Sequence, residues 1–121
     1  MARAAAGRPE RSSSSGPQYG RVVRYLTLSA DYKELSLRDE SGGQVSPVDL
    51  NLAPELQRAL EAWNLEYQRI IRFDAGQRTR VAPEIKALDD RGIQLAADIR
   101  RACQPEAKVS YYSEGLGKLL A

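Results

Sequence analysis

The sequence predicts an α+β domain in which a three-stranded antiparallel sheet is covered on one face by a helical hairpin. Two short segments of alternating apolar and polar residues come first, two amphipathic segments follow, and a third alternating segment comes last. Each amphipathic segment opens with the same tripeptide, Ala-Pro-Glu. The expected element order is therefore ββααβ. With 121 residues there is room for one domain, which we place at residues 21–113.

Three strands are expected from the alternation of side chains. The first two, at 21–28 and 34–39, are joined by the polar connection 29–33, which has the length of a hairpin turn. The third strand is expected at 108–112. Between the second strand and the helices, residues 45–52 are expected to form a partly buried extended arm. The predicted core-facing residues are Leu26, Leu28, Leu35, Leu37, Val109 and Tyr111, and the opposite face would carry Tyr25, Thr27, Ser36, Arg38, Ser110 and Tyr112.

Two helices are expected, from 54 to about 72 and from 83 to about 103. Both begin with a proline at the first helical position, where the missing N–H has no helical partner to lose. Gly92 lies within the apolar stripe of the second helix, where it would let the helix approach a bulky neighbour, and Trp63 is the expected neighbour. The predicted apolar stripes are Leu56, Leu60, Trp63, Tyr67 and Ile70 on the first helix, and Ile85, Leu88, Gly92, Leu95, Ile99 and Ala102 on the second.

The two ends of the chain are expected to lie outside the packed domain. Residues 1–20 are rich in Ala, Gly, Ser and Pro and predict a disordered leader. Residues 114–121 predict a flexible tail, which either frays or docks on the sheet edge or on a partner. The leader carries three arginines against one glutamate, so the rest of the chain balances at fifteen basic and fifteen acidic residues. The folded part therefore has no overall charge bias toward nucleic acid.

The composition argues against most enzymatic chemistry. There is no histidine, which removes histidine-based nucleophilic sites and the usual zinc sites. The single cysteine, Cys103, is expected to be an unreactive thiol, and it fits a reducing cytoplasm better than secretion. Asp89 and Asp90 are expected to be solvated partners of Lys86. No apolar run approaches the length of a membrane span. We therefore expect a cytoplasmic protein that is not an enzyme and that uses no metal or cofactor.

Two surfaces are candidates for binding a partner. The first is the outer sheet face, where Tyr25, Arg38 and Tyr112 offer contact area with polar groups. The second is the interhelical turn, where four arginines could meet phosphate or an acidic surface. The alternatives are that the sheet face is exposed to solvent without binding a partner, and that the turn is a polar segment that keeps the protein soluble. The four arginines of the turn are Arg69, Arg72, Arg78 and Arg80.

The chain resembles a group of small uncharacterised bacterial proteins, chiefly from actinobacteria, over about residues 22–113. The resemblance implies a compact cytosolic α+β domain and, by class-level analogy, an immunity protein for a toxin. The shared residues belong mostly to the expected core, so the resemblance implies a fold and no site. The residues that carry it are Tyr25-Leu26-Thr27-Leu28, Leu35-Ser36-Leu37-Arg38-Asp39, the helical series Leu56, Leu60, Trp63 and Tyr67, Gly92-Ile93-Gln94-Leu95-Ala96, and Val109-Ser110-Tyr111-Tyr112.

The preferred functional hypothesis is a non-catalytic binding protein that inhibits a toxin or another protein partner. The alternative is a nucleic-acid-associated regulator that grips phosphates with the basic turn and the leader. A small enzyme that uses arginine, tyrosine and carboxylates alone is a third hypothesis. The chain is expected to be a monomer or, through an uncovered sheet edge, a homodimer.

Overall fold

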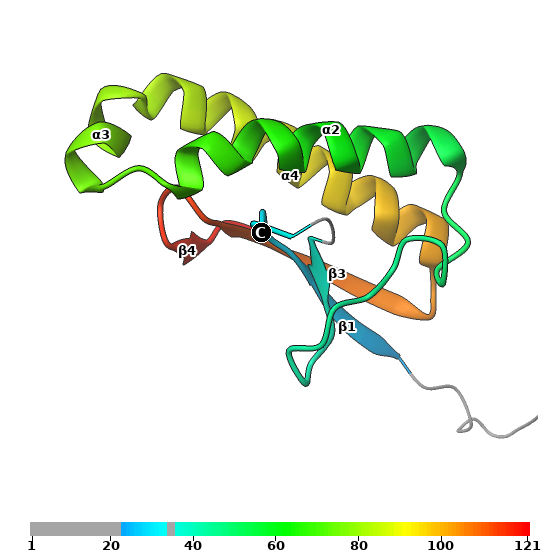
Figure 1. Cartoon of the computed structure of the whole chain (residues 1–121). Coiled ribbons are helices and arrows are strands. Elements are labelled where there is room, and N and C mark those ends of the chain that lie inside the picture. The colour runs from blue at the N-terminus through cyan, green and yellow to red at the C-terminus, as the bar shows by residue number, and fades with distance from the viewer. Residues whose placement is uncertain (1–22, 34–35) are drawn as a thin grey trace, which may run out of the picture.

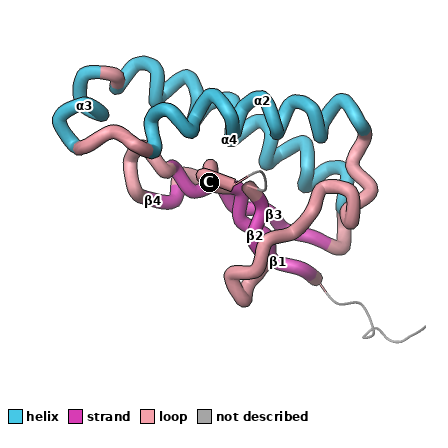
Figure 2. Tube along the Cα trace, viewed as in Figure 1, coloured by secondary structure: helices cyan, strands magenta, loops and turns pink. Residues whose placement is uncertain are grey.

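The computed structural model describes residues 23–33 and 36–121, which form a sheet and a layer of helices (Figure 1). The long helices α2 and α4 lie side by side over one face of the sheet (Figure 2). The α+β class is therefore confirmed. The expected leader, 1–20, lies outside the described residues. In chain order the elements are β1 (Arg24–Leu28), β2 (Leu37–Arg38), α2 (Pro54–Ile71), α3 (Ala75–Arg80), α4 (Ala82–Cys103), β3 (Ala107–Ser113) and β4 (Lys118–Leu119).

The sheet differs from the prediction in strand number and direction. Its described strands have the order β2-β1-β3-β4, and β1 pairs antiparallel with β2 but parallel with β3. The predicted three-stranded antiparallel sheet is therefore wrong. Residue Arg24 at the start of β1 donates its N–H to the carbonyl of Glu106 (2.8 Å), so β3 begins at the same end of the sheet as β1. Alternation of side chains specifies the two faces of a strand but not its direction.

The segment between β1 and α2 is less regular than expected. Of the predicted strand 34–39, only Leu37 and Arg38 form β2, and residues 34 and 35 lie outside the described part. The extended form predicted for the arm 45–52 is wrong, because the chain turns repeatedly over residues 47–51. Val45 and Leu52 are buried, but Val48 is 64% exposed. Leu50 is partly buried against the core as well, so the predicted partial burial of this segment is confirmed.

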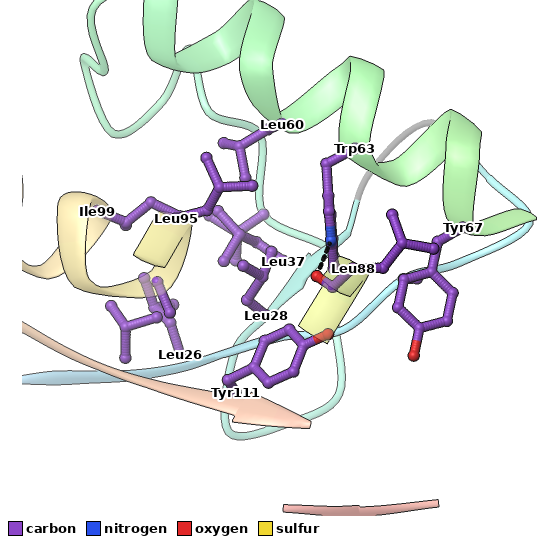
Figure 3. Close-up of a cluster of buried hydrophobic side chains, with 14 of the residues drawn as sticks. Leu26, Leu28, Leu37, Leu60, Trp63, Tyr67, Leu88, Leu95, Ile99 and Tyr111 are labelled. Atoms are coloured by element: carbon purple, nitrogen blue, oxygen red, sulfur yellow. Dashed lines mark hydrogen bonds between the residues drawn. The ribbon is translucent and has the colours of Figure 1, made fainter. Parts of the chain in front are cut away.

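The two apolar helix stripes form the core with the inner face of the sheet. Trp63 and Tyr67 of α2 are fully buried, as predicted (Figure 3). The indole N–H of Trp63 donates to the carbonyl of Leu88 (2.8 Å), which ties α2 to α4. The rings of Trp63 and Tyr67 pack edge to face with centroids 5.7 Å apart, a favourable geometry for aromatic pairs. Of the predicted stripes, Leu56 is only partly buried and Ala102 is exposed.

Gly92 lets α4 approach a bulky residue, but that residue is Tyr111 of β3 rather than Trp63. A Cβ atom at Gly92 would lie 2.2 Å from Cε1 of Tyr111. The expectation of a close approach is therefore confirmed, and its predicted partner is wrong. The cause is that α4 packs against β3 as well as against α2, and the helix periodicity does not say which neighbour a stripe residue meets.

The connection between the long helices contains the short helix α3 instead of a simple turn. Asp74 caps α3: its carboxylate accepts the N–H of Gln77 (2.8 Å), and the Gln77 side chain accepts the N–H of Asp74 (3.0 Å). This reciprocal pair is a capping box. At the other end of the chain, the expected tail docks on the sheet edge. It forms β4, and Leu120 donates its N–H to the carbonyl of Tyr111 (2.9 Å).

Candidate protein-binding surface

One face of the sheet carries no helix in the described part of the chain (Figures 1 and 2). Leu26, Leu28, Val109 and Tyr111 are buried on the helix side, so the alternate residues of β1 and β3 point the other way. Residues paired across neighbouring strands share a face. We call this surface the outer face; it consists of Tyr25, Thr27, Arg38, Lys108, Ser110, Tyr112 and Leu119.

The strand register arranges the outer face in three rows across the sheet. The first row is Tyr25 beside Lys108, and the third row is Tyr112 beside Leu119. The middle row is formed by Arg38, Thr27 and Ser110. Rows that are two residues apart along a strand are separated by about 7 Å. Because Thr27 and Ser110 are short while both outer rows carry longer side chains, the part of the middle row on β1 and β3 is expected to be lower than the rows beside it, and Arg38 bounds it at the β2 end.

The predicted members of the outer face are not all available. Tyr25 is 52% exposed and Tyr112 is partly exposed, as the sequence predicted. Arg38 lies on the face, but its guanidinium pairs with the carboxylate of Asp31 and donates to the carbonyl of Gly42 (3.3 Å). Ser36 is buried, so its predicted place on the open face is wrong.

The four arginines expected at the interhelical turn do not converge on one site. Arg78 donates to three carbonyls, those of Phe73 (3.0 Å), Ile71 (3.0 Å) and Glu114 (2.8 Å). It therefore holds the end of α2 and the residue after β3 together. Arg69 pairs with the carboxylate of Glu84 (2.8 Å), and its guanidinium carbon lies 5.6 Å from the ring centroid of Phe73.

Arg72 and Arg80 are the remaining two arginines of this group. Both side chains are exposed, and neither makes an ion pair or hydrogen bond within the described residues. Two of the four arginines thus have structural contacts, and two remain free for an anionic partner. Sequence spacing predicted their nearness along the chain but could not show these carbonyl contacts.

Asp89 forms a buried polar network that the sequence analysis missed. Its side chain is 3% exposed, so the expected solvated pair with Lys86 is wrong for Asp89. One carboxylate oxygen accepts the hydroxyls of Tyr67 (2.8 Å) and Tyr111 (2.6 Å), and the other accepts the hydroxyl of Ser113 (2.7 Å). The network joins α2, α4 and β3. The expected ion pair with Lys86 is made by Asp90 instead (3.0 Å).

Burial and the Asp89 carboxylate change the acidity of the two tyrosines in this network. Burial raises the pKa of Tyr67 to about 12, and Asp89 adds to the rise. Burial and Asp89 also raise the pKa of Tyr111. Both phenols therefore stay protonated at neutral pH and can donate to the carboxylate. The network has the hydrogen bonds that a buried carboxylate requires, and it faces the core rather than a substrate pocket.

Among residues 23–33 and 36–121 there is no cluster of side chains suited to a metal ion. These residues contain no group of three or more cysteine, aspartate or glutamate side chains that could hold a metal ion. Burial, and secondarily Glu106, raises the pKa of the Cys103 thiol, which favours the unreactive form that the sequence predicts. None of the described helices is long and apolar enough to cross a membrane.

A groove of about 570 Å³ lies between α2 and the loops on either side of β2. Its wall includes the exposed side chains of Tyr32, Val48 and Leu65. Asn64 of α2 holds this region by accepting the N–H of Asp31 (2.8 Å) and by donating to the carbonyl of Lys33 (2.8 Å). Its lining residues Lys33 and Ser36 are the sequence neighbours of residues 34–35, which lie outside the described part, and we assign the groove no ligand.

A protein-family model described as Serratia CdiI immunity protein-like matches residues 24–114. The match begins at the first residue of β1 and ends directly after β3, so it includes both long helices and the whole Asp89 network. The chain belongs to the Serratia CdiI immunity protein-like family. A search of curated proteins finds no match.

Membership in the CdiI immunity protein-like family confirms the immunity-protein part of the resemblance noted in the sequence. The bacterial and chiefly actinobacterial origin implied by that resemblance stays a prediction. Membership in a CdiI immunity protein-like family implies a protein partner, a toxin, and the outer face is a candidate surface for it. Two members of this face were missed in the sequence. Lys108 is the first residue of the predicted third strand, and its alternation with Val109 places it on the outer face. Leu119 lies on a strand that was not predicted.

Proposed function

We propose that this protein is an immunity-type inhibitor that binds a toxin in the bacterial cytoplasm and blocks it without catalysis of its own. The observation that carries the proposal is the family match over residues 24–114. The lack of histidine and the raised pKa of the single cysteine, Cys103, are consistent with a binding role. Inhibition then requires only that the bound chain covers a surface that the toxin needs.

The outer face is the proposed binding surface. Tyrosine combines a large apolar area with a hydroxyl that can bond to a partner, and tyrosine and arginine are enriched among residues that dominate binding energy. Tyr25 and Tyr112 lie on the first and third rows, and Arg38, in the middle row, is already paired with Asp31, so the two tyrosines are the main contact residues proposed for this face. The interhelical arginines are less suited to be the main surface, because Arg69 and Arg78 are held by contacts within the chain.

Coexpression with a toxin tests the proposal. The candidate probes are the products of the genes that adjoin the gene of this chain, and the toxin is whichever of them kills the host in which it is produced. The full-length chain is expected to restore growth and to form a stable complex of fixed stoichiometry with the purified toxin in sedimentation. Failure to restore growth, together with no complex, would refute the proposal. Salt-dependent binding to nucleic acid in the absence of any toxin complex would favour the alternative of a nucleic-acid-associated regulator.

A further inference from the structure

The middle row of the outer face is built from hydrogen-bond donors. Thr27 and Ser110 face each other across β1 and β3, and neither hydroxyl is bonded to another group in the described part of the chain. The Lys108 ammonium, in the adjacent row, also has no ion pair there. Both short hydroxyl residues are half-buried, in keeping with their position between rows of longer side chains.

The charge on this face has one sign. Of its seven residues, Arg38 and Lys108 are basic and none is acidic. Near β2, Asp31 is paired with Arg38, and Asp39 accepts the hydroxyl of Ser41 (2.6 Å) and the N–H of Gly43 (3.0 Å). Glu40 is exposed in the turn after β2, outside the three rows. Glu106 and Glu114 lie beyond the two ends of β3, outside the three rows. The face therefore offers the hydroxyls of Thr27 and Ser110 at its centre and the ammonium of Lys108 in the adjacent first row.

We propose that the toxin places an acidic side chain on the middle row, between the raised first and third rows. This inference rests on the proposed function and specifies the chemistry of its partner. The carboxylate would accept hydrogen bonds from Thr27 and Ser110 and pair with the ammonium of Lys108. Apolar atoms around the acidic residue would contact Tyr25 on one side and Tyr112 on the other. Hydrogen bonds with an ionised acceptor are stronger than neutral ones, and water is partly excluded between the two raised rows.

Charge reversal at three positions tests the proposal. Lys108→Glu places a carboxylate at the outer face, Arg80→Glu changes the interhelical turn, and Arg58→Glu changes an exposed position of α2. Affinity for the toxin-like protein described above is measured by calorimetry with the full-length chain. Lys108→Glu is expected to raise the dissociation constant about tenfold or more, because like charges then meet at the interface. Arg58→Glu and Arg80→Glu are expected to leave it within about twofold, as for charges outside an interface.

A second variant tests the low centre of the face independently of charge. Ser110→Trp places a large side chain in the middle row, where the acidic side chain of the toxin would lie. This variant is also expected to weaken binding about tenfold, because the two side chains cannot occupy the same space. Thermal unfolding midpoints close to that of the unmodified chain show that both variants are folded. The dissociation constant of the unmodified chain should rise with salt more steeply than that of Lys108→Ala.

The outcomes separate the two proposals. If the unmodified chain neither binds nor protects, the proposed function fails. If it protects but Lys108→Glu binds as well as Arg58→Glu does, the acidic contact is refuted and the proposed function stands. A larger loss of toxin affinity with Arg80→Glu than with Lys108→Glu would place the interface at the interhelical turn and would also refute the acidic contact. The acidic contact would also be refuted if the chain forms a homodimer that Lys108→Glu dissociates without a change in toxin affinity. The outer face would then bind a second copy of this chain.

Discussion

Replacing Gly92 with alanine tests how tightly α4 is packed on β3. An added Cβ would lie 2.2 Å from Cε1 and 2.6 Å from Cζ of Tyr111. Carbon atoms in contact are normally about 3.5–4.0 Å apart, so the ring would have to move by about 1.5 Å. Tyr111 has no exposed surface, its hydroxyl donates to Asp89 at 2.6 Å, and its ring centroid lies 6.0 Å from that of Trp63. The ring therefore has no free direction in which to move.

The expected loss of stability follows from three contributions. Overpacking of a core costs about 1–3 kcal/mol. Weakening of the hydrogen bond between Tyr111 and Asp89 costs about 1 kcal/mol more. Alanine in place of glycine within a helix stabilises by about 1 kcal/mol, which offsets the lost hydrogen bond. The free energy of unfolding of Gly92→Ala is therefore expected to fall by about 1–3 kcal/mol, measured by urea denaturation.

A matched control separates packing from helix propensity. Gly76 is exposed in α3, and a Cβ there would meet only the Asp74 carboxylate at 3.5 Å. Gly76→Ala is therefore expected to stabilise the protein by up to about 1 kcal/mol. In a Tyr111→Ala background the ring is absent, so Gly92→Ala should no longer destabilise. The reasoning is refuted if Gly92→Ala stabilises the unmodified chain as Gly76→Ala does.

Three further predictions concern the core that lies beneath the outer face. Trp63→Ala is expected to lower the free energy of unfolding by about 3–5 kcal/mol, and an unchanged urea midpoint would contradict the packing described here. Asp89→Ala leaves three buried hydroxyls without their acceptor and is expected to cost about 3 kcal/mol or more, whereas Asp89→Asn, which keeps an acceptor oxygen, should cost less in the same urea experiment. Above pH 10 an unfolded tyrosine loses its proton while Tyr67, with its pKa raised to about 12, keeps it. The contribution of such a tyrosine to the free energy of unfolding is complete below pH 10. Between about pH 10 and 12 the free energy of unfolding is therefore expected to fall by about 1.4 kcal/mol per pH unit for each such tyrosine. A Tyr67→Phe variant should show a shallower decline, and equal slopes would contradict the assignment.

The sequence was a good guide to elements whose periodicity is governed by burial. Both long helices begin within one residue of the predicted position, because proline and the apolar stripe mark their starts. The inward and outward faces of β1 and β3 also follow the predicted alternation. Strand direction was not predictable in this way, since β3 alternates identically whether it runs parallel or antiparallel to β1.

Features that depend on contacts between distant residues were missed. Asp89 is followed by Asp90 and preceded at three residues by Lys86, and that local pattern is typical of a solvated helix surface. Its burial depends on hydroxyls from Tyr67, Tyr111 and Ser113, which lie at least 22 residues away along the chain. The candidate site shows the same division: Tyr25 and Tyr112 were predicted from alternation, but Leu119 reaches the face only because the C-terminal segment pairs with β3.

The buried network around Asp89 also determines where the third row of the outer face lies. The hydroxyl of Ser113, which donates to Asp89, accepts the N–H of Leu116 (3.0 Å), and the hydroxyl of Tyr67 accepts the N–H of Gly115 (2.9 Å). These bonds hold the turn that follows β3, and the turn brings Leu119 beside Tyr112. A buried polar network that is fully hydrogen-bonded can specify one arrangement where an apolar contact would allow several. Loss of Asp89 should therefore disturb toxin binding through the third row, while the contact proposed for Lys108 on the first row is retained.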